Sequence, residues 1–235
     1  MRVERISEII RLASMLSIAL PLIIYLVRFR SASRPVHLIG ALSIVSALSD
    51  LIAYFLFIRG QSTVVLFNLY YTVMFLLLTW FYYQVLLTAR SKVTVLAGLG
   101  IYLLSFILVT TYVQTFFEYQ TSMWTITGLI MIIYSVSYFL SLFSAQTTMN
   151  NYGLLWINSG ILFYFSFNLS LFVMSSYVLT KLEPQISMLI WSFHNVNNIV
   201  KNILLGVGVL VYSVDVSTIR NLIPPKKTGK HVIVQ

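Results

Sequence analysis

Seven apolar stretches alternate with short polar segments along the chain. They cover residues 8–27, 37–58, 64–87, 93–116, 123–143, 152–178 and 185–213. Each is long enough to cross a membrane, because a spanning helix needs about 20 predominantly apolar residues. The short connections predict that consecutive helices are antiparallel neighbours. The pattern therefore predicts an all-α, polytopic membrane protein, with a seven-transmembrane-helix bundle over residues 1–213 and a basic cytoplasmic tail over 214–235.

Two prolines predict where particular helices bend or begin. Pro21 lies inside the first stretch, where its missing N–H and its ring should kink the helix. Pro184 precedes the seventh stretch and suits the first turn of a helix, where an N–H has no intrahelical partner. We therefore expect a bent first helix and a seventh helix that starts at Pro184.

Composition supports the membrane assignment. Hydrophobic residues make up 59% of the chain and charged residues 9%, with a mean hydropathy of +0.89, whereas soluble domains carry about 25% charged residues. The net charge is +9, but the Lys and Arg residues lie mainly between apolar stretches, where membrane topology explains them. Nucleic acid is therefore not expected as a partner, whereas membrane lipid is.

The distribution of Lys and Arg predicts the orientation, because cytoplasmic loops carry the excess of these residues. One side of the predicted bundle carries nine, namely Arg28, Arg30, Arg34, Arg90, Lys92, Arg220, Lys226, Lys227 and Lys230. The other side carries five, namely Arg2, Arg5, Arg11, Arg59 and Lys181. This difference places the N-terminus outside and the C-terminus in the cytoplasm, although the three N-terminal arginines favour the opposite orientation.

Polar residues form an arc on the otherwise apolar seventh stretch. At 100° per residue, His194, Asn198 and Lys201 share one helix face, and Asn197 and Asn202 flank it. Such groups are costly in lipid unless they face protein or water, so the arc should point into the bundle. It is a candidate ligand-binding site or switch.

Asp50 is the only carboxylate deep within any predicted span. By residue count along the helices it lies near the level of His194. It could therefore meet His194 or Asn198 directly, and Lys201 through that residue's long side chain or a water. Two interpretations stay open, namely a structural network that joins the second and seventh spans, and a site that responds to a ligand, an ion or a proton.

Other spans contribute further candidates. Asn68 and Tyr71 on the third span and Asn158 on the sixth are expected to share an internal cavity with the arc, although hydrogen bonding between helices would also explain them. Trp80, Tyr82 and Tyr83 are instead expected at the membrane interface, where Trp and Tyr are enriched.

The sequence lacks the motifs of several enzyme classes. It has no cysteine, and its three histidines show no metal-binding spacing. No phosphate-binding loop or nucleophile elbow occurs. An enzyme is therefore not favoured. A membrane lipid hydrolase remains an alternative that needs at least one more acid or metal ligand near Asp50.

Three segments carry a resemblance to a known group, namely FNLYYTVMFLLLTWFYYQVL, LLWINSGILFYFSFNLSLFV and LIWSFHNVNNIVKNILLGVGV. Together they resemble an uncharacterised group of bacterial seven-transmembrane proteins that is similar to the membrane sensor regions of some histidine kinases. The resemblance covers nearly the whole chain and implies a sensory module whose output comes from a separate protein. It implies no particular site residues.

Microbial rhodopsins offer a second comparison, since they share seven helices, an outside N-terminus and a retinal-bearing lysine in the seventh. Lys201 would take that part. The third span here has no carboxylate to act as counter-ion, and Asn197 stands where that family has an Asp before the lysine. No cofactor is therefore expected, and retinal on Lys201 is kept as an alternative.

The sequence as a whole favours a receptor-like membrane sensor of a bacterial inner membrane, with no enzymatic domain of its own. A ligand, ion or proton in the cavity would alter helix packing, and a separate signalling protein on the cytoplasmic side would receive the signal. A small transporter or channel-like protein that uses the same polar face is the main alternative. The sequence indicates neither the ligand nor the oligomeric state.

Overall fold

The computed structural model describes residues 2–86, 88–144 and 152–222. Within these ranges every regular element is helical, which confirms the predicted all-α class. The elements are α1 (Arg2–Ser17), α2 (Ala19–Arg28), the 3-10 turn η1 (Phe29–Ser31), α3 (Arg34–Ile58), α4 (Val64–Val85), α5 (Ala89–Tyr112), α6 (Thr121–Ser144), α7 (Tyr152–Lys181) and α8 (Pro184–Leu222).

In the described part of the chain, six helical segments are long and apolar enough to cross a membrane, which indicates an integral membrane protein. The segment over α1, α2 and η1 counts as one span, and α3 to α7 supply the other five. The predicted count of seven is not confirmed, because α8 is not among the six candidates in the described part of the chain. Its middle carries His194, Lys201 and four asparagines, and each of them lowers the mean hydropathy.

The last helix extends beyond its predicted end. The seventh stretch was expected to stop at residue 213, whereas the backbone of α8 remains helical to Leu222. Its start at Pro184 agrees with the prediction. Residues 214–222 of the predicted tail therefore belong to α8, and residues 223–235 lie outside the described residues.

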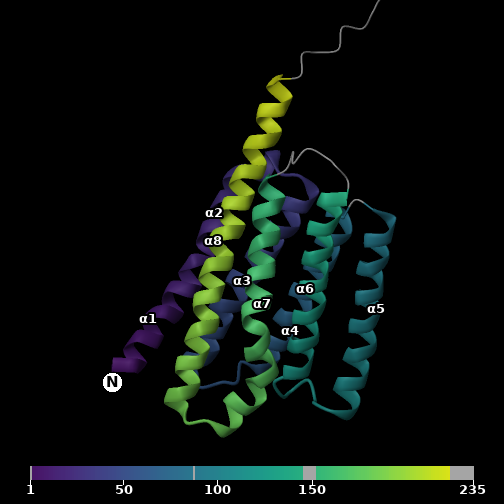
Figure 1. Cartoon of the computed structure of the whole chain (residues 1–235). Helices are drawn as coiled ribbons and strands as arrows, with labels where there is room; N and C mark the ends of the chain where they lie inside the picture. Colours follow the sequence, from purple (N-terminus) through teal and green to yellow (C-terminus); the bar gives the residue numbers. More distant parts are fainter. Residues whose placement is uncertain (1, 87, 145–151, 223–235) are drawn as a thin grey trace, which may run out of the picture.

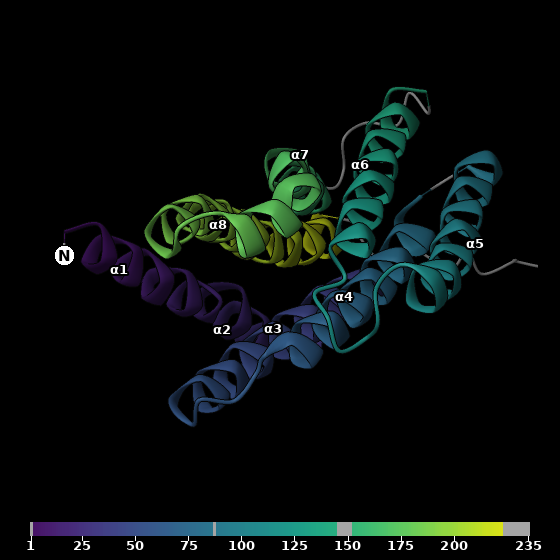
Figure 2. The same ribbon diagram turned by 90° about the horizontal axis from the view of Figure 1, so that it is seen from below.

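The helices pack side by side into a ring. Along it α2 packs on α3, α3 on α4, α4 on α6, α6 on α7 and α7 on α8, while α5 lies outside against α4 and α6. The ring closes because α8 also packs against α1 and α2 (Figures 1 and 2). The first and last helices are thus neighbours, and α2 lies between α3 and the C-terminal half of α8.

The first span bends where Pro21 predicts a kink. The helix is interrupted at Ile18, between the end of α1 at Ser17 and the start of α2 at Ala19. Pro21 has no N–H to donate to the carbonyl of Ser17, four residues earlier, so the helical hydrogen-bond ladder breaks there. Below the bend α1 remains packed on α8 but leaves α3, on which α2 packs (Figure 1).

Glycines bring α7 and α8 into close contact. A Cβ atom on Gly208 would lie 2.8 Å from the carbonyl oxygen of Gly153 and 2.9 Å from the backbone nitrogen of Ile157. Gly160 lies seven residues after Gly153 on the same face, and its Cβ would lie 3.0 Å from Leu204. In lipid, helix association depends on such packing by small residues, because lipid chains are as apolar as the side chains.

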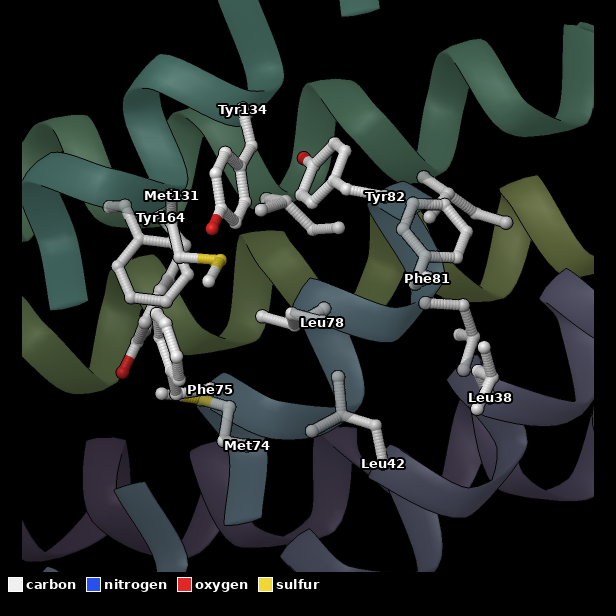
Figure 3. Close-up of a cluster of buried hydrophobic side chains, with 14 of the residues drawn as sticks. Leu38, Leu42, Met74, Phe75, Leu78, Phe81, Tyr82, Met131, Tyr134 and Tyr164 are labelled. Atoms are coloured by element: carbon white, nitrogen blue, oxygen red, sulfur yellow. The ribbon is translucent and has the colours of Figure 1, made fainter. Parts of the chain in front are cut away.

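The buried core surrounds α4. Its buried side chains Phe75, Leu78 and Tyr82 lie in one cluster with Leu42 of α3, Tyr134 of α6 and Tyr164 of α7 (Figure 3). Phe75 and Tyr82 are fully buried, and Phe75 stacks on Tyr102 of α5 with ring centroids 3.7 Å apart. Helix α4 therefore holds the two halves of the ring together.

Gly208→Ala should destabilise the protein by about 1–3 kcal/mol, because the added methyl group overpacks the α7–α8 contact against backbone atoms. Gly100→Ala is the matched control, since a Cβ there meets nothing within 4 Å. It should be neutral or stabilise by up to about 1 kcal/mol through helix propensity. Unfolding of the purified protein in mixed micelles, followed by circular dichroism, measures both. Equal effects of the two substitutions would contradict the close approach.

Candidate functional site

A cavity of about 380 Å³ lies inside the ring. Its walls come from α1, α3, α4, α7 and α8, with Tyr119 from the segment before α6 and Trp124 from its first turn. Phe, Tyr and Trp supply nine of its 21 lining residues. This volume lies within the range of sites for small molecules, about 300–1,000 Å³.

The cavity occupies the half of the bundle that holds the N-terminus. Its lining includes Phe57 near the end of α3, Thr63 just before α4 and Leu179 near the end of α7, and these helix ends lie on the same side as the N-terminus (Figure 1). Asp50 lies eight residues before the end of α3, about 12 Å deeper, and His194 lies ten residues after the start of α8, about 15 Å deeper. The cavity therefore reaches from that end to about the middle of the bundle.

Arg11 lies near the cavity mouth. Its guanidinium carbon is 5.3 Å from the centroid of the Phe57 ring. This cation–π contact connects α1 and α3 across the space that the bend in the first span creates.

Asp50 and His194 line the same cavity, as their predicted depths require, but they do not pair. Among the described residues the Asp50 carboxylate has neither a hydrogen-bond nor an ion-pair partner. The reason lies in the ring order, since α8 packs mainly on α7, α1 and α2 rather than on α3. Within the described residues, no hydrogen bond therefore connects Asp50 of α3 with the polar arc of α8.

Two asparagines of the α8 arc bind α1 instead. Asn198 donates from Nδ2 to Oγ of Ser14 at 2.9 Å, and Asn202 donates to Oγ of Ser17 at 2.8 Å. Asn202 is fully buried, and Asn198 also lines the cavity. The arc points into the bundle as expected, but its partners belong to the first span, which sequence spacing alone could not identify.

Lys201 is buried beside the cavity without being part of its lining. Its ammonium nitrogen lies 4.5 Å from the centroid of the Tyr164 ring, and Tyr164 does line the cavity. In the described part of the chain, Lys201 makes this contact with the Tyr164 ring rather than an ion pair with Asp50.

Asn68 acts as a clamp on the segment between α5 and α6. Its Nδ2 donates to the carbonyl oxygens of Phe116 and Glu118, at 2.9 and 2.7 Å, and its Oδ1 accepts from the backbone N–H of Gln120 at 3.3 Å. The side chain is not part of the cavity lining. It positions the segment that carries Tyr119 into the cavity wall.

Asn158 lies in a second buried network, also away from the cavity. Its Oδ1 accepts from the hydroxyl of Tyr82 at 2.8 Å, and its Nδ2 donates to the carbonyl of Ser135 at 3.2 Å. Tyr82 is fully buried and also contacts the Ser135 hydroxyl at 2.6 Å. The prediction that Tyr82 lies at the membrane interface is therefore wrong, because its hydroxyl joins α4 to α6 and α7.

Tyr71 lines the cavity, together with two tryptophans that the sequence did not single out. Trp124 stacks on Tyr71 with ring centroids 5.0 Å apart, and Trp191 lies edge-on to Trp124 at 6.5 Å and to His194 at 5.3 Å. Tryptophan near the end of a membrane helix is typical of the membrane interface. The sequence pattern therefore did not indicate that these two residues line a cavity.

Three nitrogen atoms of this aromatic cluster have no hydrogen-bond partner among the described residues. They are Nε1 of Trp124, Nε1 of Trp191 and Nδ1 of His194, and all are buried. A buried donor without a partner is destabilising, and tyrosine and tryptophan usually find one. These unsatisfied nitrogens distinguish the cavity wall from the paired networks of Asn68 and Asn158.

Comparison with protein-family models, curated proteins and solved structures finds no match to this chain. In the described residues no group of three or more His, Asp or Glu side chains could hold a metal ion. The assignment of the site therefore rests on its own geometry.

Asn68→Ala should destabilise the protein by about 1–3 kcal/mol, because it leaves the buried N–H of Gln120 and two partly buried carbonyls of the α5–α6 segment without their partner. Asn195→Ala is the control, since Asn195 lines the cavity and its side chain has no hydrogen bond to a described residue. We expect the control to stay within about 0.5 kcal/mol of the parent protein. Unfolding in micelles distinguishes them, and a stable Asn68→Ala protein would contradict the clamp.

Proposed function

We propose that the chain is a receptor-like membrane sensor that binds a small molecule in the cavity and transmits the binding event along α8. In this proposal α8 crosses the membrane as a seventh span. The N-terminus and the cavity mouth face outside, and the C-terminus lies in the cytoplasm of a bacterium. A separate cytoplasmic signalling protein would read the change in α8.

The observation that carries this proposal is the course of α8. Near its start Trp191, His194 and Asn198 line the cavity, and its far end projects beyond the other helices (Figure 1). Its 39 residues correspond to about 58 Å of helix, whereas the apolar core of a bilayer is about 30 Å thick. One continuous helix thus connects the ligand cavity with a segment outside the bundle.

Two features support a membrane-crossing α8 despite its polar arc. The polar side chains of the arc are directed into the bundle, where Asn197 donates to Oδ1 of Asn168 at 3.2 Å and Asn202 pairs with Ser17. Exposed positions on the same helix are apolar, for example Phe193, Ile203 and Leu210. A helix with this division can face lipid on one side while its polar groups face protein.

In the proposed mechanism, a bound ligand contacts two helices on opposite sides of the cavity. The cavity lies between α3, which carries Asp50, and α8, which carries His194 and Trp191. A ligand that contacts both helices changes their preferred spacing, and it can shift the equilibrium only by its differential affinity for the two arrangements. Helix displacements of about 1–2 Å are typical of such transitions.

Single cysteines test the topology, because the chain contains none of its own. Ser62→Cys and Glu183→Cys should react with a membrane-impermeant maleimide in intact cells. Arg30→Cys and Thr228→Cys should react only after permeabilisation. If α8 does not cross the membrane, Thr228→Cys will label together with Glu183→Cys, and the seven-span proposal fails.

Partial filling of the cavity tests the coupling between cavity and α8. Ala53 lines the cavity, so Ala53→Trp should occupy part of its volume as a ligand would. With spin labels at Met174→Cys on α7 and Phe193→Cys on α8, electron paramagnetic resonance should show a change of about 2 Å in the α7–α8 distance at the cavity end. Both labelled positions are exposed.

Two controls make this measurement decisive. Leu48→Trp introduces the same side chain on the exposed face of α3 and should leave the α7–α8 distance unchanged. Labels at Leu96→Cys on α5 and Val136→Cys on α6 should report no change in either variant. A folded Ala53→Trp protein with unaltered distances would rule out the proposed coupling. Solute uptake into proteoliposomes would favour the transporter alternative.

A further inference from the structure

We infer that the ligand of this cavity is a small zwitterion of the amino acid type, with an ammonium group at Asp50 and a carboxylate at the tryptophan N–H groups. This inference rests on the proposed function in one respect, namely that the cavity is the ligand site of the sensor. It is carried by the charges of the lining, by its unsatisfied polar atoms and by its aromatic walls.

The first argument is the charge of the lining. Its formal charges are Arg11 and Asp50, which have opposite sign, and Lys201 adds a third charge from beyond the Tyr164 ring. Arg11 and Lys201 already pack on aromatic rings, whereas the Asp50 carboxylate has no partner among the described residues. A carboxylate on an aromatic wall needs a cation or hydrogen-bond donors, and a ligand ammonium supplies both.

The second argument concerns the unsatisfied donors. The indole N–H groups of Trp124 and Trp191 are buried and unpaired within the described residues, and each can only donate a hydrogen bond. Trp124 is only 3% exposed, so its N–H requires an acceptor within the cavity or its wall. His194 Nδ1 lies beside Trp191 and is unpaired as well. This cluster calls for an oxygen acceptor, which a ligand carboxylate provides.

A ligand with a single charge can pair either with the Asp50 carboxylate or with the indole N–H groups, but not with both. A simple amine would pair with Asp50 but leave both indole donors unpaired, and it would add a third positive charge beside Arg11 and Lys201. A simple carboxylate would satisfy the donors but leave Asp50 unpaired and repel it. A zwitterion satisfies both and brings no net charge into the bundle.

The walls and the volume limit the rest of the molecule. Tyr71 and Trp124 present stacked rings to the cavity, and Phe67, Tyr70 and Tyr164 add further aromatic surface. Rings pack favourably against other rings and against apolar groups. A volume of about 380 Å³ suits a single amino acid or a dipeptide better than a larger peptide.

Binding to the purified protein in lipid nanodiscs, measured by isothermal titration calorimetry, tests the inference. The probes are the twenty L-amino acids and, for each binder, its decarboxylated amine and its deaminated acid. For phenylalanine these analogues are 2-phenylethylamine and 3-phenylpropionate. We expect the zwitterion to bind at least tenfold more tightly than either analogue, because each analogue leaves one polar group of the wall unpaired.

Substitutions then assign each end of the ligand. Asp50→Asn should abolish the preference for the amino acid over the acid analogue, with Glu183→Gln as its matched control outside the cavity. Trp124→Phe and Trp191→Phe should reduce the preference over the amine analogue. Trp156→Phe is their control, since Trp156 is partly exposed on α7 and is not part of the lining.

The outcomes separate this inference from the proposed function. Tighter binding of the amine or of the acid overturns the zwitterion assignment but leaves a ligand cavity. No binding by any of the twenty amino acids also overturns it, and the proposed function then stands if Ala53→Trp still alters the α7–α8 distance. If the lining substitutions change binding no more than Glu183→Gln and Trp156→Phe do, the ligand binds elsewhere and the inference is wrong.

Discussion

Two hydrogen bonds between the first and last helices determine the shape of this protein. Asn198 binds Ser14 and Asn202 binds Ser17, and these pairs lie one turn apart on two helices that run in the same direction. In lipid such contacts contribute about 1 kcal/mol each, and they also satisfy amides that would otherwise be costly to bury. Because they hold α1 on α8 while the break at Ile18 directs α1 away from α3, a cavity remains between these helices in the half of the bundle that holds the N-terminus.

The buried polar residues of the bundle serve two different purposes, which burial alone does not distinguish. Asn68 and Asn158 use both ends of their amides to join separate segments, so their hydrogen-bonding capacity is largely consumed by the fold. The indole nitrogens of Trp124 and Trp191 and Nδ1 of His194 are also buried but lack partners among the described residues. The distinction between a stabilising network and a candidate site therefore depends on which polar atoms remain unpaired, and that information exists only in the folded geometry.

The sequence predicted the helices and the orientation of their polar faces, because both depend on local periodicity. The bend near Pro21, the start of α8 at Pro184 and the common depth of Asp50 and His194 all follow from counting residues along a helix. The partners of Asn198 and the burial of Tyr82 depend on the order of helices around the ring, which periodicity does not encode. The expectation that Asn198 would meet Asp50 failed for this reason, since α8 closes the ring on the first span instead.

In the proposed sensor, the contacts that hold α8 are more rigid at one end of the bundle than at the other. A ligand at the less rigid end could therefore tilt the whole helix. Toward the C-terminal end of the bundle, Gly208 packs against the backbone of α7, a steric contact that allows little displacement. Toward the cavity, α8 is held by amide–hydroxyl hydrogen bonds, which tolerate small shifts better than a backbone contact does. A ligand that separates His194 from Asp50 would therefore tilt α8 about its glycine contact. The projecting end would move in the opposite direction, so a small change at the cavity would become a displacement outside the bundle.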